Sequence, residues 1–192
     1  MKKIAIFASG NGSNFEALAA ACKKGIIPAE TVLCVCDHPG AYVTERAVRH
    51  GIRVLEFRPK SYPSKAEYEA MILEQLKKEK VDLICLAGYM RIVGDTLLKA
   101  YPERIINIHP SLLPAFPGVD AIGQALDYGV KVFGVTVHFV DSTLDGGKII
   151  AQSAIPYEGN DRETLETMVH AHEHALYVET VRSLINTLKD HS

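Results

Sequence analysis

The sequence lacks an excess of charge of either sign, a long apolar run and a cysteine framework. Its 192 residues carry a formal net charge of −2, so bulk electrostatics gives no reason to expect a nucleic-acid or membrane partner. No segment approaches the length of a membrane span, and the N-terminus has no apolar signal region followed by a small-residue cleavage site. None of the four cysteines forms a Cys-x-x-Cys pair, so we expect reduced thiols in a cytoplasmic protein.

Internal repeats, low-complexity tracts and linkers are absent as well, which predicts a single domain over residues 1–192. The composition, 47% hydrophobic and 23% charged, is typical of a globular chain. Apolar runs alternate with helical patterns through the first 109 residues. This alternation predicts an α/β fold, a doubly wound and mostly parallel Rossmann-like sheet with helices on both faces. The expected strands are Ile4–Ala8, Thr31–Cys36, Arg53–Phe57, Val81–Ala87 and Arg104–His109, and the expected helices are Asn14–Lys24, Tyr42–His50, Ser64–Lys78, Gly94–Ala100 and Val119–Tyr128.

The last third of the chain departs from this alternation. Val132–Val140 and Lys148–Ile155 are both predicted to be strands, and the loop between them is too short for a helical crossover. This spacing predicts an antiparallel C-terminal strand pair. A long closing helix is predicted over Asp161–Leu188, with Asp161 or Asn160 as its cap.

A glycine-rich loop, Ser9–Asn14, follows the first predicted strand and opens a helix. Glycines allow a ligand close to the backbone, and the free N–H groups at a helix start attract an anion such as phosphate. Three interpretations remain open at this point: a mononucleotide or sugar phosphate, an NAD-type cofactor, and a plain tight turn. For a dinucleotide fingerprint Gly10 and Gly12 match, and Asp37 could serve as the ribose-binding acid, but Phe15 occupies the third glycine position. A P-loop is excluded because no Gly-Lys-Ser/Thr follows.

Polar side chains also follow the strand Arg104–His109. Asn107 and His109 leave the same face of that strand, because side chains alternate along a strand. Three prolines between positions 110 and 117 then stiffen the next loop, which ends at a glycine. Asp145 lies thirty-six residues after His109, in a glycine-flanked turn between two apolar strands. Since ligands bind at the carboxyl ends of parallel strands, we expect these three side chains to meet at that edge.

Such a cluster suits acyl transfer to an amine. Asn107 can donate a hydrogen bond to the oxyanion of a tetrahedral intermediate, and a protonated His109 adds positive charge. Asp145 would favour the imidazolium form of His109 and could accept the proton that the amine loses. A single histidine at a strand end is more often structural, so this hypothesis depends on the other two residues.

Several segments of the chain resemble the folate-dependent glycinamide ribonucleotide formyltransferases of purine biosynthesis. The similarity runs almost from end to end. It is carried by Ala8-Ser-Gly-Asn-Gly-Ser-Asn-Phe15, Leu86-Ala-Gly-Tyr-Met-Arg-Ile92, Asn107-Ile-His-Pro-Ser-Leu-Leu-Pro114, Gly134-Val-Thr-Val-His-Phe-Val140, Leu144-Asp-Gly-Gly147 and Glu173-His-Ala-Leu-Tyr177. The resemblance implies formyl transfer from 10-formyltetrahydrofolate, as co-substrate and without a metal, to the amine of glycinamide ribonucleotide.

The resemblance also implies roles for individual residues. The implied catalytic residues are Asn107, His109 and Asp145. The implied ribonucleotide-binding residues are Gly12, Ser13, Asn14 and Glu173, and the implied folate-binding residues are Lys65, Met90, Arg91, Ile92, Val93, Asn107, Val140 and Asp141. On this basis residues 1–100 would form the ribonucleotide-phosphate half and residues 101–192 the folate-binding and catalytic half. The only assembly that we consider for this chain is a homodimer.

Two positions depart from the family pattern. Lys65 stands where some relatives carry an arginine near the folate, so the planar guanidinium is lost. Asp120 stands where some carry a histidine, which puts the role of that position in doubt. His170 and His174 share one face of the last helix at a spacing that can hold a metal, but no third ligand is apparent.

Three rival functions follow from the same features. A 10-formyltetrahydrofolate deformylase would use the same trio with water as the nucleophile, but such enzymes usually carry an additional N-terminal domain. A formyltransferase for methionyl-tRNA would need a nucleic-acid-binding domain after the catalytic one. A non-catalytic nucleotide-binding module would use the glycine loop without the trio.

Overall fold

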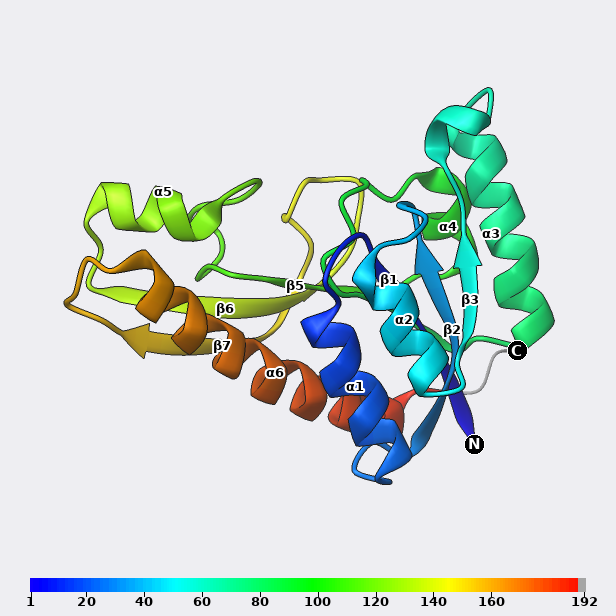
Figure 1. Ribbon diagram of the computed structural model, residues 1–192, viewed down its shortest axis with the longest axis horizontal. Coiled ribbons are helices and arrows are strands. Elements are labelled where there is room, and N and C mark those ends of the chain that lie inside the picture. Colours follow the sequence, from blue (N-terminus) through cyan, green and yellow to red (C-terminus); the bar gives the residue numbers. More distant parts are fainter. Residues whose placement is uncertain (190–192) are drawn as a thin grey trace.

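One seven-stranded sheet runs through the computed structural model, which describes residues 1–189 (Figure 1). Its strand order is β3-β2-β1-β4-β5-β6-β7. The strands are β1 (Lys2–Ala8), β2 (Ala29–Cys36), β3 (Arg53–Glu56), β4 (Leu83–Leu86), β5 (Ile105–His109), β6 (Val132–Phe139) and β7 (Ile149–Pro156). The first five strands pair in parallel, β6 runs antiparallel to β5, and β7 runs antiparallel to β6.

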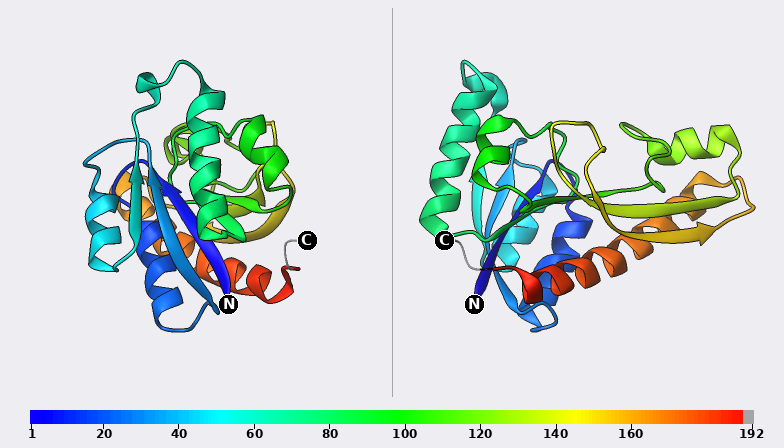
Figure 2. Two further views of the ribbon diagram at one scale, coloured as in Figure 1. Left: turned by 90° about the vertical axis from the view of Figure 1, so that its right-hand side faces the viewer. Right: turned by 180° about the vertical axis from the view of Figure 1, so that it is seen from behind.

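Helices cover both faces of this sheet (Figure 2). The helices are α1 (Ser13–Lys23), α2 (Tyr42–Arg49), α3 (Lys65–Glu79), α4 (Asp95–Ala100), α5 (Ala121–Tyr128) and α6 (Arg162–Thr187), with a short 3-10 turn η1 (Pro59–Ser61) before α3. Strand alternation divides the core in two. Ile4 and Ile6 of β1 pack with α1, α2 and α6 on one face, and Ala5 and Phe7 pack with α3 and α4 on the other.

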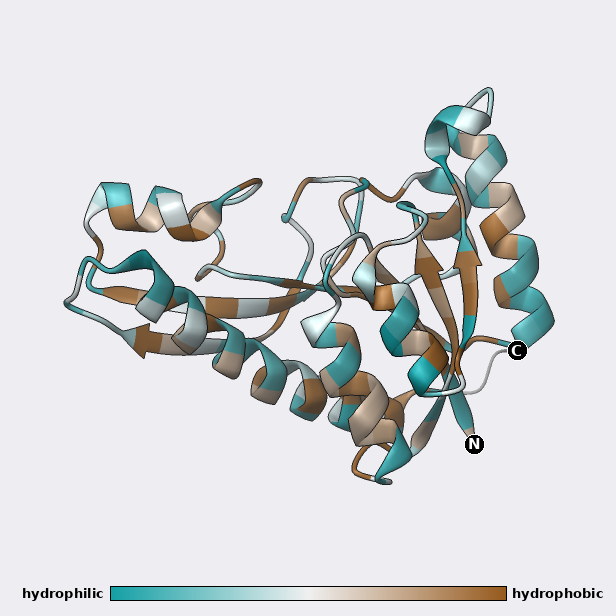
Figure 3. Cartoon of the chain, in the orientation of Figure 1, coloured by the Kyte–Doolittle hydropathy of each residue, from teal (hydrophilic) through white to brown (hydrophobic). Residues whose placement is uncertain are grey.

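The central strands are apolar throughout because both of their faces are covered. In β1 every residue from Ile4 to Ala8 is buried, as is every residue of β4. Hydrophobic residues accordingly concentrate in the strands in Figure 3, whereas the helices mix hydrophobic and hydrophilic turns. Cys34, Cys36 and Cys85 lie in the core as free thiols, as the sequence predicts for small buried residues.

The long closing helix α6 confirms the prediction for the C-terminal part. Its N-cap is Asp161, whose carboxylate accepts a hydrogen bond from the Thr164 N–H at 2.8 Å. The helix runs along β6 and β7 and past α1 (Figure 1). Tyr177 is fully buried there, and its hydroxyl donates to the carbonyl of Leu86 at 2.8 Å, which ties α6 to the end of β4.

The predicted fold class is confirmed, with small shifts at the element boundaries. Helix α5 begins at Ala121 rather than Val119, because Asp120 adopts the left-handed conformation with φ 54°. The strand expected to begin at Val81 begins at Leu83, because the Val81 N–H bonds back to Leu76 at the end of α3. Among the residues 1–189, no helix is both long and apolar enough to cross a membrane.

The order of the strands creates a crevice between β1 and β4. From β1 the chain moves outward to β2 and β3, and then crosses back to β4 on the other side of β1. The loops that follow β1 and β4 therefore diverge at the carboxyl edge of the sheet. Such a reversal is where ligands bind in doubly wound folds.

Candidate active site

A cleft of about 980 Å³ opens at this edge. It brings together segments that lie far apart in the sequence, from the end of β1 to the middle of α6. The predicted site residues that line it are Gly12, Ser13, Asn14, Met90, Arg91, Ile92, Val93, Asn107, His109, Val140, Asp141, Asp145 and Glu173. Lys65 is the one predicted site residue outside this lining.

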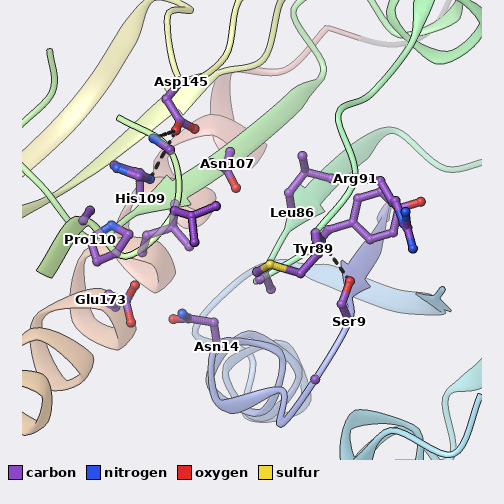
Figure 4. Close-up of a pocket in the computed structure, with 18 of the residues that line it drawn as sticks. Ser9, Asn14, Leu86, Tyr89, Arg91, Asn107, His109, Pro110, Asp145 and Glu173 are labelled. Carbon is purple, nitrogen blue, oxygen red and sulfur yellow. Dashed lines mark hydrogen bonds and ion pairs between the residues drawn. The ribbon is translucent and has the colours of Figure 1, made fainter. Parts of the chain in front are cut away.

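His109 and Asp145 face one another in the cleft (Figure 4). The His109 Nδ1 atom lies 3.5 Å from Asp145 Oδ2, and both side chains are largely buried. His109 Nε2 lies 2.8 Å from the carbonyl oxygen of Phe116, which can only accept, so this nitrogen carries a proton. With Nε2 protonated, only the doubly protonated ring can also donate toward Asp145. The geometry therefore suits an imidazolium next to a carboxylate.

Asn107 lies opposite His138 in the antiparallel pairing of β5 and β6. His138 Nδ1 donates to the Phe139 carbonyl at 2.8 Å, and burial lowers the pKa of this histidine, so its ring is neutral with Nε2 as an acceptor. Asn107 Nδ2 donates to that Nε2 atom at 3.2 Å. This contact fixes which end of the Asn107 amide is the donor and leaves its second N–H available to the cleft.

The loop between β6 and β7 holds Asp145 by its backbone and by its carboxylate. Asp145 has φ 49°, a left-handed conformation that aspartate tolerates better than most residues, and its Oδ2 accepts from the Gly118 N–H at 2.8 Å. Gly147 is buried against β6, where an added Cβ would overlap the carbonyl oxygen of Phe139. Glycine at this position therefore lets the loop return close enough to place Asp145 beside His109.

The glycine loop after β1 is fixed from the side of α2. Gly12 has φ 78° and lies against Val43, whose Cγ2 atom would be 2.5 Å from an added Cβ. Arg46 donates from Nε to the Asn11 carbonyl at 2.8 Å and from Nη2 to the Asn11 amide oxygen at 3.0 Å. Within the described chain no side chain caps the start of α1, so its first N–H groups are available to an anion.

Asn14 and Glu173 meet across the cleft from α1 and α6 (Figure 4). Burial raises the pKa of Glu173 to about 7, and a hydrogen bond from Asn14 opposes this shift. The Asn14 amide oxygen is buried and has no partner in the part of the chain that the structure describes. These groups offer a hydroxyl-bearing ligand two acceptors, the Asn14 oxygen and the Glu173 carboxylate.

We expect Glu173→Gln to change the pH dependence of stability. The pKa of Glu173 is about 7 in the folded chain against 4.5 as the ordinary value, so the folded state holds the proton more tightly. Its stabilising effect is therefore complete below pH 4.5 and is lost as pH rises through 7, a change of about 3 kcal/mol. Urea unfolding should show the variant gaining clearly more stability over the wild type at pH 8 than at pH 5. The exposed Glu158→Gln is the control, and an equal gain at both pH values would contradict the assignment.

The segment after β4 forms another wall of the cleft. Met90 and Ile92 are 70% and 56% exposed, an unusual degree for large apolar side chains, and both line the cleft. Arg91 donates from Nε to Asp37 Oδ2 at 2.7 Å. One interpretation of the sequence made Asp37 a ribose-binding acid. That interpretation is wrong, because the Asp37 side chain is completely buried.

The other residues that the sequence analysis named as candidates lie in or near the cleft. Lys65 does not reach into it, and its Nζ donates instead to the Ile92 carbonyl at 3.0 Å. Asp120 lines the cleft and forms an ion pair with Arg162 at 2.6 Å. His170 lines the cleft, whereas His174 is not among the residues that line it. Within residues 1–189 no three His, Cys, Asp or Glu side chains are grouped so that they could hold a metal ion.

His138 is the functional residue that the sequence prediction missed. It lies in an apolar strand, where a histidine gives no signal of its own. Its importance comes from its register opposite Asn107 and from its Nε2 atom, which lies 3.8 Å from Asp145 Oδ1. Only the pairing of the two strands could have revealed it.

Comparisons with known proteins show the family to which the chain belongs. The chain matches the formyl transferase family over residues 2–181. A phosphoribosylglycinamide formyltransferase from Bacillus subtilis (strain 168) is 55% identical over 186 residues, which cover 96% of this chain and 95% of that protein. The crystal structure of glycinamide ribonucleotide transformylase 1 from Geobacillus kaustophilus has a TM-score of 0.94 at 54% identity and covers 96% of this chain and 99% of its own. The trifunctional purine biosynthetic protein adenosine-3 of Drosophila melanogaster is 39% identical over 188 residues, 96% of this chain but 14% of that longer protein.

Proposed function

Since the chain belongs to the formyl transferase family, and within it to the phosphoribosylglycinamide formyltransferases, we propose that it formylates glycinamide ribonucleotide in purine biosynthesis. The donor is 10-formyltetrahydrofolate, and no metal takes part. The observation that carries this proposal is the convergence of Asn107, His109 and Asp145 in one cleft with the glycine loop.

The ribonucleotide lies along the α1 side of the cleft. Its phosphate binds the N–H groups at the start of α1, at Gly12, Ser13 and Asn14, because a helix N-terminus favours an anion. Glu173 accepts hydrogen bonds from the ribose hydroxyl groups. This arrangement directs the glycinamide amine toward the end of β5.

The folate lies between the walls formed by residues 90–93 and 140–145. The exposed side chains of Met90 and Ile92 offer apolar contact to a flat ring, and the backbone of the same segment offers hydrogen bonds to its edge. Val140 and Asp141 also line the cleft. Residues 1–100 thus supply the phosphate site, and residues 101–192 supply the catalytic trio. The two walls of the folate site come one from each half.

The chemistry is direct attack of the amine on the formyl carbon. The new C–N bond gives a tetrahedral alkoxide, which the Asn107 amide stabilises by a hydrogen bond and the His109 imidazolium stabilises by its positive charge. Asp145 holds the imidazolium and accepts the proton that the amine loses, directly or through water. The bond to N10 of the folate then breaks, N10 takes up a proton, and tetrahydrofolate leaves.

A spectroscopic assay of 10-formyltetrahydrofolate consumption tests this function. We expect consumption that requires glycinamide ribonucleotide and continues in the presence of a metal chelator. Equal consumption without the ribonucleotide would identify a deformylase. No consumption in either case, with folded protein, would favour a nucleotide-binding module. Light scattering of the same preparation would show whether the enzyme is a homodimer. We propose that the enzyme acts in the cytoplasm.

The phosphate site gives a matched pair of glycine variants. Gly12→Ala forces alanine into φ 78° and against Val43, so we expect it to cost roughly 1–3 kcal/mol of stability and to raise the KM for the ribonucleotide more than that for the folate. Gly10→Ala is the control for stability, because an added Cβ there meets nothing within 4 Å. Urea unfolding and steady-state kinetics measure both effects. A larger rise in the folate KM would place the phosphate elsewhere.

A further inference from the structure

Residues 90–94, which follow β4 and include the 90–93 wall of the proposed folate site, have no regular secondary structure of their own. Backbone that is not fixed by a helix or a strand must be ordered by other contacts if it is to bind a ligand without a large entropic cost. Four side chains from three other elements supply such contacts. They are Ser9, Asp37, Lys65 and Glu69.

The first group lies at the carboxyl ends of β1 and β2. Ser9 accepts a hydrogen bond from the Met90 N–H at 2.8 Å and donates from its own hydroxyl to Asp37 Oδ1 at 2.5 Å. Asp37 Oδ2 accepts from Arg91 Nε at 2.7 Å. Asp37 thus fixes the backbone at position 90 through Ser9 and fixes the side chain at position 91 directly. The Arg91 side chain is still 39% exposed, and Arg91 lines the cleft.

The second group lies on the first turns of α3. Lys65 and Glu69 are four residues apart and therefore share one face of the helix. Lys65 Nζ donates to the Ile92 carbonyl at 3.0 Å, and Glu69 Oε1 accepts from the Gly94 N–H at 2.7 Å. Glu69 is only 3% exposed, and it lies so close to the backbone that an added Cβ at Gly94 would be 2.8 Å from its Oε2. The two contacts hold the backbone on both sides of Val93.

From this geometry we infer that Asp37 and Glu69 are positioning residues that hold the 90–94 segment in its donor-binding conformation from opposite ends. Neither carboxylate lines the cleft, so each acts through the segment and not on the substrate. The inference rests on the proposed function, in which this segment binds the folate. It also gives Lys65 a different role from direct folate contact, as a support for the Ile92 carbonyl.

The two carboxylates differ in the charge that their contacts need. Burial raises the pKa of Asp37, but the hydrogen bonds from Ser9, Arg91 and His38 outweigh burial and leave that pKa below its ordinary value. Asp37 therefore acts as an anion that faces a guanidinium. Burial raises the pKa of Glu69, and its bond from the Gly94 N–H and the nearby Lys65 only partly oppose the shift. A neutral acceptor is sufficient at Glu69, because its partner is an uncharged N–H.

This contrast defines the test, which measures KM for both substrates, kcat and thermal stability. We expect Asp37→Asn to raise the KM for 10-formyltetrahydrofolate by about tenfold, with the ribonucleotide KM and kcat within about threefold of the wild type, because a charge-assisted hydrogen bond is lost. At Glu69 we expect alanine to raise the folate KM about fivefold and glutamine to keep it within twofold, since glutamine still offers an oxygen to Gly94. Asp95→Asn, an exposed carboxylate paired with Lys99 on the adjoining helix α4, is the control.

Several results would overturn the inference. A folate KM for folded Asp37→Asn equal to that of the wild type would do so, and so would equal damage from Glu69→Gln and Glu69→Ala. A purely structural role would lower the melting temperature and the fraction of active enzyme while leaving the folate KM of the active fraction unchanged. Calorimetric titration of each variant with 10-formyltetrahydrofolate alone reads the same effect without turnover. If the wild type neither binds nor consumes the folate, the proposed function itself has failed, which is a separate outcome.

Discussion

Replacing His109 with alanine is expected to lower kcat by about 10³-fold while the Kd for the ribonucleotide stays within a few fold. The imidazole lies at the end of β5 with Nε2 fixed by the Phe116 carbonyl at 2.8 Å and Nδ1 facing Asp145 at 3.5 Å. In the proposed mechanism alanine removes the positive charge that stabilises the developing alkoxide, and it leaves the proposed phosphate site at α1 untouched. Rapid-quench or steady-state turnover, together with calorimetric binding of the ribonucleotide, separates the two effects.

His172→Ala is the matched control for this variant. His172 belongs to α6 and bonds Ser153 at 2.8 Å outside the cleft, so its loss should change kcat by less than about twofold. If His109→Ala instead abolished ribonucleotide binding while turnover per bound substrate persisted, the assignment of His109 to the chemical step would be wrong. A loss of the same size in both variants would indicate damage to the fold.

Asp145→Asn is expected to lower kcat by about 10²- to 10³-fold, with little change in the melting temperature. Asparagine keeps an oxygen that can accept from the Gly118 N–H, a bond of 2.8 Å, so the loop between β6 and β7 should keep its position. What it removes is the negative charge beside His109 Nδ1 and beside His138 Nε2, at 3.5 Å and 3.8 Å. Without that charge the proposed imidazolium loses its counter-ion, and the amine proton loses its proposed acceptor.

The exposed Asp127→Asn on α5 serves as the control for charge alone. Turnover near the wild-type level in Asp145→Asn would mean that the carboxylate only supports the loop, and the proton would then need another acceptor. A large drop in melting temperature would mean that asparagine fails to keep the Gly118 bond. Measurement of kcat and melting temperature on both variants separates these outcomes.

The arrangement of Asn107, His109 and Asp145 depends on a change of strand direction that no single residue of the sequence predicts. Strands β5 and β6 are antiparallel, and their register sets Asn107 opposite His138 and His109 opposite Thr136. A slip of one residue would turn His138 to the other face of the sheet. The neutral His138 ring then could not receive the Asn107 amide, and the orientation of the catalytic donor would be lost.

Most of the architecture could be predicted from the sequence, since each element has a local signature. Continuous apolar runs mark β1 and β4, and the stripe on α3 and the cap at Asp161 mark the helices. The errors fall where long-range contacts decide a boundary. One is the left-handed turn at Asp120, where the start of α5 moves by two residues.

The candidate site could be predicted only in part. Asn107 and His109 share a face because strands alternate, and this inference needs no tertiary structure. Asp37 shows where prediction of the site from the sequence fails. From the sequence it resembles a ribose-binding acid at the end of a strand, yet in the fold its side chain is wholly buried and bonds Ser9 and Arg91. Whether a carboxylate faces solvent or a guanidinium depends on packing between segments about fifty residues apart.

By itself the sequence determined the order of strands and helices, the edge of the sheet that carries the chemistry, and the residue types available there. Those features depend on local periodicity, on glycine and proline conformations, and on the rule that parallel strands present their ends together. The tertiary structure alone decided the register that pairs Asn107 with His138, the approach of Asp145 to His109, and the support of residues 90–94 by Asp37 and Glu69. These contacts join residues between about 25 and 54 positions apart, and their geometry is fixed by how the two cores pack and not by any pattern within a segment.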